Sequence, residues 1–169
     1  MSVSGFRLHA PMSVATEVTL SMLVAFQRRG QDAWELGIVR RMRRLSANNA
    51  EIGLQSIANA LIGADLVVQG QSTDVERTVS GVQAVPVGRE FHGLFLMYSR
   101  RPGDQAVQSL IVPPADYRPD GVFALQAADA AQTIRFTRVV ERHTDWVWTV
   151  IEPVEAVAPD DTATAATPR

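Results

Sequence analysis

The sequence predicts an all-β protein. Short runs rich in Val, Ile, Leu and aromatic residues alternate with Gly, Pro and Asn clusters, which is typical of strands joined by tight turns. Helical periodicity is scarce. The chain has 169 residues and 46% hydrophobic content, enough to bury a core in one domain or in two small β units. We expect antiparallel strands arranged in two successive β units.

The first unit is expected to span residues 1–69. Its strands are predicted at residues 3–9, 18–26, 33–43, 50–57 and 64–69. The polar loop between the second and third strands contains Gly30, which can supply the positive φ of a hairpin turn. The next loop contains Asn48 and Asn49, and Asn tolerates the left-handed conformation. The strands between residues 18 and 57 should therefore form an antiparallel meander.

Residues 70–80 are polar and are predicted to be an exposed loop or boundary before a second unit at residues 81–152. Strands are predicted at residues 81–87, 91–99, 105–112, 121–126, 132–141 and 146–152. Two connections carry strong turn chemistry, because Pro presets φ and a glycine such as Gly121 accepts positive φ. Residues 153–169 consist largely of Ala, Thr, Pro and Asp, which predicts a disordered tail.

The composition excludes several functions. With no cysteine, the chain has no disulfide, thiolate zinc site or cysteine nucleophile. A net charge of −2 argues against a broad positive surface for nucleic acid. No apolar run approaches the roughly 20 residues that span a bilayer, and no signal-peptide pattern is seen at the N-terminus. The cytoplasm is therefore the expected location.

No catalytic or metal site is predicted. The three histidines, His9, His92 and His143, are far apart and lack the spacing of metal ligands. No serine lies in a nucleophile-elbow pattern, and no Gly-rich loop is suited to cradle a phosphate. We therefore expect a protein that is not an enzyme and needs no cofactor.

The three tryptophans lie in alternating strands beside Val and Leu. Trp146 and Trp148, two residues apart, should share one face of a strand. We interpret these two and Trp34 as aromatic residues of the core, and the alternative is a platform on which nucleic-acid bases stack.

Three blocks of the sequence, in order, resemble the PilZ domain family. The segment from Ser2 to Gly5 resembles the second half of the PilZ ligand motif, in which Asp or Asn and any residue precede Ser-x-x-Gly on a strand. Residues 33–40 end in the Gly-x-Val-Arg pattern of a later PilZ strand, and residues 51–55 resemble the closing strand. The resemblance is specific for residues 2–55. Over residues 81–152 it extends to the C-terminal β region of a group of proteobacterial PilZ proteins.

This resemblance implies a PilZ-like antiparallel β-barrel, incomplete at its N-terminus and followed by a second small antiparallel β unit. It also implies a regulatory module of cyclic di-GMP signalling. PilZ domains bind cyclic di-GMP through an Arg-x-x-x-Arg pair before the barrel and through the Asp/Asn-x-Ser-x-x-Gly strand. By this motif, Ser2 and Gly5 are the implied ligand-binding residues. The chain starts between the Asp or Asn and the Ser, so it looks truncated, and nucleotide binding is expected to be impaired. A protein partner is expected downstream.

A second arginine pair lies at Arg40 and Arg44. In the PilZ family the pair precedes the Ser-x-x-Gly strand, whereas this one ends a later strand, so the role is not transferred. On a regular strand, Arg40, Met42 and Arg44 project to one face. We interpret these arginines as solvated charges that protect a sheet edge, and phosphate contacts from Arg40 and Arg44 are the alternative.

The alternative function is a β-barrel interaction or scaffold domain without a nucleotide ligand. A barrel that lacks its first strand leaves an unpaired edge. Such an edge predicts a homodimer as one arrangement.

Overall fold

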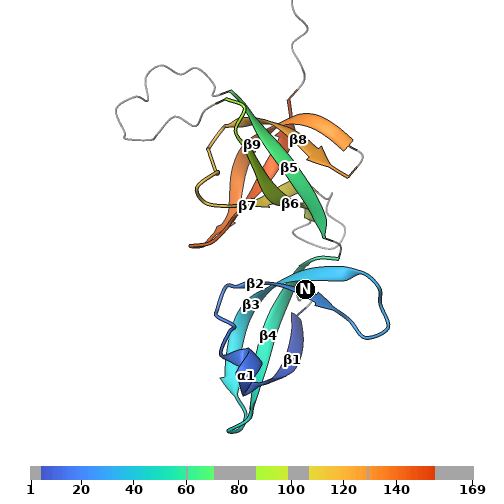
Figure 1. Ribbon diagram of the computed structural model, residues 1–169, viewed down its shortest axis with the longest axis vertical. Helices are drawn as coiled ribbons and strands as arrows, with labels where there is room; N and C mark the ends of the chain where they lie inside the picture. Colours follow the sequence, from blue (N-terminus) through green and yellow to red (C-terminus); the bar gives the residue numbers. More distant parts are fainter. Residues whose placement is uncertain (1–4, 60, 71–86, 99–106, 129, 155–169) are drawn as a thin grey trace, which may run out of the picture.

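The computed structural model describes residues 5–59, 61–70, 87–98, 107–128 and 130–154. These residues form a four-stranded sheet and a closed six-stranded barrel, one above the other in Figure 1. The predicted all-β class is confirmed. Three predictions lie wholly or mostly outside the described residues: the boundary at 70–80, the strand at 81–87 and the tail at 153–169.

The four-stranded sheet is antiparallel, with the strand order β1-β4-β3-β2. The predicted meander is confirmed, and β1 extends it along the free side of β4. A single helical turn, α1, connects β1 to the segment before β2. The elements are β1 (Gly5–Pro11), α1 (Met12–Ala15), β2 (Leu23–Gln27), β3 (Trp34–Arg44) and β4 (Asn49–Ala58).

The two hairpin turns of this sheet use different chemistry. Gly30 has the predicted positive φ, +82°. In the β3–β4 turn, by contrast, neither Asn48 nor Asn49 has a positive φ, so the predicted left-handed Asn is wrong. The backbone amides of Leu45 and Ser46 both donate to the Asn49 carbonyl, at 3.0 and 3.1 Å, and close the turn without a left-handed residue.

The barrel closes in the order β10-β7-β6-β5-β8-β9. The strand expected to end the first unit, at residues 64–69, instead pairs with β6 and β8 of the barrel. Burial explains this pairing, because Ala64, Leu66 and Val68 alternate along the strand and pack into the barrel interior. The barrel strands are β5 (Ile62–Gly70), β6 (Glu90–Tyr98), β7 (Val107–Val112), β8 (Val122–Ala127), β9 (Ala130–Arg142) and β10 (Val147–Pro153).

The turn before β8 shows a second difference from the expected backbone. Asp120 takes the positive φ, +57°, in place of Gly121. A Cβ at Gly121 would lie 2.8 Å from the ring of Phe123. Gly121 is therefore needed for close packing and not for its left-handed conformation.

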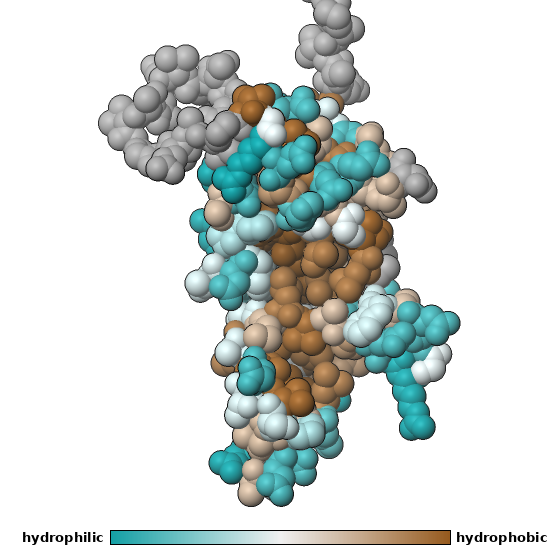
Figure 2. Space-filling view, viewed as in Figure 1, coloured by the Kyte–Doolittle hydropathy of each residue, from teal (hydrophilic) through white to brown (hydrophobic). Residues whose placement is uncertain are grey.

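Three apolar clusters fill the molecule. The barrel core includes Phe123 and Phe136, whose rings stack at 4.2 Å. A second cluster, the sheet core, comprises Ala15, Phe26, Val39, Ala50, Ile52 and Leu54. The third, the junction cluster, joins the sheet to the barrel and comprises Leu36, Ile38, Ala58, Leu96, Ile111, Trp146 and Trp148. On the face shown in Figure 2, apolar side chains gather in a band across this junction.

The tryptophans divide between core and surface. Trp146 and Trp148 are buried in the junction cluster, as predicted. The indole of Trp146 donates to the carbonyl oxygen of Ser21, in the turn before β2, at 3.0 Å. The prediction for Trp34 is wrong, because its position at the start of β3 leaves it 53% exposed.

None of the helices in the described ranges is long and apolar enough to cross a membrane.

Candidate anion-binding site

One face of the four-stranded sheet changes from apolar to charged along its length. On β3, Leu36 and Ile38 pack into the junction cluster against the barrel. Farther along, arginines replace these apolar residues, and β1 and β4 contribute glycines and further polar side chains. The sheet therefore has an apolar end that holds the barrel and a cationic end that is exposed.

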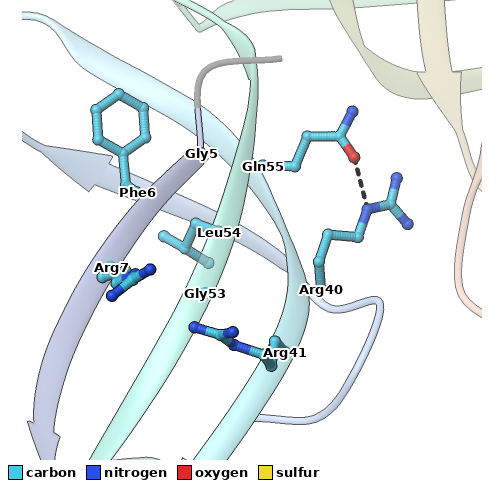
Figure 3. A pocket seen from close by; sticks show the side chains of 8 residues that line it. All are labelled: Gly5, Phe6, Arg7, Arg40, Arg41, Gly53, Leu54 and Gln55. Carbon is cyan, nitrogen blue, oxygen red and sulfur yellow. Dashed lines mark hydrogen bonds between the residues drawn. The ribbon is translucent and has the colours of Figure 1, made fainter. Parts of the chain in front are cut away.

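A shallow pocket of about 400 Å³ lies at the start of this cationic end. It is formed by β1, β3 and β4, and Figure 3 shows its side chains. Its lining consists of Gly5, Phe6, Arg7, Arg40, Arg41, Gly53, Leu54 and Gln55. Three arginines from two strands thus surround one hollow.

Cross-strand pairing places two of these arginines on either side of a glycine. Arg7 on β1 and Arg41 on β3 are both direct partners of Gly53 on the intervening strand β4. Figure 3 shows the Arg7 side chain on β1 and the Arg41 side chain reaching from β3 over β4 beside Gly53. Because glycine has no side chain, the Arg41 side chain can lie over it: a Cβ at Gly53 would be 3.3 Å from Arg41 Cβ and 3.8 Å from Arg41 Nε.

A β-bulge brings Arg40 to the same pocket. Val39 pairs with Leu54 and Arg41 pairs with Gly53, which are consecutive residues on β4. Arg40 is therefore an extra residue on β3 that has no cross-strand partner. The predicted common face of Arg40, Met42 and Arg44 is wrong for Arg40. Met42 packs against the sheet core together with Val39, whereas Arg40 lines the pocket.

The sites predicted from the sequence are only partly brought together. Gly5 begins β1 and lines the pocket with Arg40, and Ser2 lies outside the described residues. Arg44 does not line it, because its guanidinium donates to the Ser46 carbonyl at 3.0 Å in the β3–β4 turn. The described part of β3 beyond Val39 pairs with β4 alone, so these arginines do lie on a sheet edge.

Arg40 is held by three hydrogen bonds. Its Nη1 and Nη2 atoms donate to the two carboxylate oxygens of Glu141 on β9, at 2.5 and 2.6 Å, and its Nε donates to Gln55 Oε1 at 2.7 Å. The hydrogen bond from Arg40 lowers the pKa of the Glu141 carboxyl, and His143 lowers it further, against the opposing effect of burial. The same hydrogen bond raises the pKa of Arg40.

The other two arginines are less constrained. Arg41 Nη2 donates to Glu51 Oε1 at 2.7 Å, and its remaining donors have no partner among the described residues. Arg7 is exposed and makes no ion pair within the described part of the chain. Among the described residues, Arg7 therefore brings to the pocket a positive charge that no carboxylate compensates, as an anion site requires.

The histidines lie apart from one another. His9 faces Glu51, His92 faces Asp65 and His143 faces Glu141, each on a different part of the two sheets. Within the described ranges, no three His, Asp or Glu side chains gather closely enough to hold a metal ion.

Sequence reasoning did not identify Arg7, Arg41, Gly53 or Gln55 as parts of one site. Arg7 could have been predicted from the sequence, because it lies two residues after Gly5 and so on the same face of β1. For Arg41 the sequence carried no signal, since the bulge at Arg40 is not evident in the residue pattern.

Comparison with protein-family models, with curated proteins and with solved structures gives no match.

Proposed function

We propose that the pocket between β1, β4 and β3 binds the phosphate groups of a cyclic dinucleotide, and that the chain is a regulatory module and not an enzyme. The observation that carries this proposal is the placement of Arg7 and Arg41 on either side of Gly53. Cyclic di-GMP is the ligand that the resemblance to PilZ domains implies. Gly5, the described position of the resembling motif, lines the same pocket.

The chemistry of the pocket supports a phosphate ligand. Guanidinium groups are planar forks that bind two phosphate oxygens at once, and they also stack on flat rings such as guanine. The absence of a side chain at Gly53 leaves room for the Arg41 side chain, which lies close to it and brings its guanidinium group to the pocket. A volume of about 400 Å³ lies within the range of small-molecule sites.

Affinity in this proposal is modest. Glu51 and Glu141 neutralise part of the positive charge, and the shallow pocket leaves much of a bound ligand in water. This agrees with the impaired binding expected from the partial motif. As a receptor for an intracellular messenger, the module would act in the cytoplasm.

A second candidate function is a β interaction or scaffold domain that binds no nucleotide. Two observations favour it: Arg40 is already engaged by Glu141, and an apolar band crosses the face shown in Figure 2. Exposed apolar patches often mark contacts between proteins. In this second proposal, one such partner is a second copy of the chain, which pairs with the outer edge of β1 or β2.

Calorimetric titration of cyclic di-GMP distinguishes the two functions. We predict saturable binding by the wild-type chain and a loss of about tenfold or more in affinity for Arg7→Ala and for Arg41→Ala, because each removes a charge-assisted hydrogen-bond donor. Arg29→Ala is the matched control, since Arg29 lies in the exposed β2–β3 turn away from the pocket.

The outcomes are separable. Equal loss of binding in Arg29→Ala would show that net charge, and not the pocket, governs binding. Absence of heat from the wild-type chain, with the fold intact by circular dichroism, would favour the scaffold.

A further inference from the structure

We propose that Glu141 of the barrel is an autoinhibitory residue of this pocket: its carboxylate occupies Arg40 and links ligand binding to the contact between barrel and sheet. The inference rests on the proposed function, because it concerns the regulation of the same pocket. Glu141 and Arg40 are 101 residues apart in the sequence and belong to different sheets.

The hydrogen bonds of Arg40 show what a ligand must displace. A guanidinium group has five N–H donors, and its two Nη atoms form the fork that binds a carboxylate or a phosphate. In Arg40 both Nη atoms already donate to Glu141. A phosphate that binds this fork therefore takes the place of the Glu141 carboxylate.

Charge adds to this competition. The negative charge of Glu141 lies directly across Arg40 from a pocket that is proposed to receive a dianion, and like charges repel. The exchange is feasible because the ion pair is only partly buried: 35% of the Arg40 side chain and 25% of the Glu141 side chain are exposed. Ion pairs of this kind contribute little net stability, since water solvates the released groups.

Release of Glu141 from Arg40 would alter side-chain contacts at the junction between the two sheets. His143 Nε2 lies 2.6 Å from Glu141 Oε1, and the His143 ring packs against the indole of Trp146 at 4.3 Å between centroids. Trp146 in turn donates to the carbonyl of Ser21, in the turn that leads into β2 of the four-stranded sheet. Arg40, Glu141, His143 and Trp146 thus form a continuous path from the pocket to the junction cluster.

The test compares the affinity of wild-type protein and Glu141→Gln for cyclic di-GMP by calorimetry. Glutamine keeps the size of the side chain and removes the charge, so we expect binding to tighten by about five- to tenfold. Glu152→Gln is the matched control: it removes the same charge from the exposed end of β10, away from the pocket, and should leave the affinity unchanged.

A second readout follows the path to Trp146. The exposed tryptophan is first removed by Trp34→Phe. Cyclic di-GMP should change the tryptophan fluorescence of this single variant. It should change the fluorescence much less when Glu141→Gln is added to the same variant.

The two proposals fail in different ways. Equal affinities of the wild type and Glu141→Gln, or equal tightening by Glu152→Gln, would overturn autoinhibition and leave the pocket's function standing. Heat of binding without a fluorescence change would also overturn it. Absence of binding by wild type and by Glu141→Gln would overturn the proposed function, and the autoinhibition with it.

Discussion

Gly93 on β6 occupies one of the tightest positions in the barrel. A Cβ at this position would lie 2.9 Å from the Ile111 carbonyl oxygen and 3.2 Å from Val112 Cγ1. The carbonyl belongs to the neighbouring strand β7, so it cannot move without disturbing the barrel. We predict that Gly93→Ala lowers the free energy of unfolding by about 1–3 kcal/mol, as measured by urea denaturation.

Gly63 on β5 is the control for this prediction. A Cβ there would meet nothing within 4 Å, so Gly63→Ala should leave stability unchanged or raise it slightly. Equal destabilisation by the two substitutions would contradict the close packing described for Gly93.

Residue by residue, the candidate site was only partly predictable. Gly5 and Arg40 were singled out from the sequence, and both line the pocket. The face of the sheet on which the Arg40 side chain lies was not predictable. A bulge adds one residue to β3 and reverses the alternation on which such predictions depend. Glu141 reaches Arg40 through tertiary structure alone, which no local pattern encodes.

At the level of elements, the strands followed from the alternation of apolar residues and from the turn chemistry. The sheet that β5 joins did not follow from these patterns. Its apolar residues are compatible with either sheet, and which sheet it joins depends on packing against β6 and β8. The helical turn α1 was missed because its four residues are too few to show a helical period.

The ion pair between β3 and β9 predicts a pH dependence. The pKa of Glu141 is lowered in the folded protein from an ordinary value of 4.5, through Arg40 and then His143. The pair therefore stabilises the fold above about pH 4.5, and this contribution is lost as the pH falls through the lowered pKa. Because both side chains are partly exposed, we expect at most about 1 kcal/mol.

Thermal unfolding of wild type and Glu141→Gln between about pH 3 and pH 7 measures this contribution. The wild type should be the more stable at neutral pH, and the difference should vanish at the acidic end. A difference independent of pH would contradict the assigned role of the Glu141 charge.

Over the whole molecule, one sheet face serves two purposes. Its apolar end completes the junction cluster with the barrel, and its cationic end forms the pocket. Because Arg40 lies where the two ends meet, the barrel can influence the pocket without lining it.

The most direct test of the central claim is nuclear magnetic resonance mapping of cyclic di-GMP onto the chain. Saturable shifts are predicted at the backbone amides of Gly5, Arg7 and Gly53 and at the side-chain Nε resonances of Arg7 and Arg41. The backbone amides of Gly5 and Gly53 should stay unmoved in the Arg7→Ala, Arg41→Ala double variant. No shifts in the wild type, or shifts confined to the barrel interior, would contradict a phosphate-binding pocket between β1, β4 and β3.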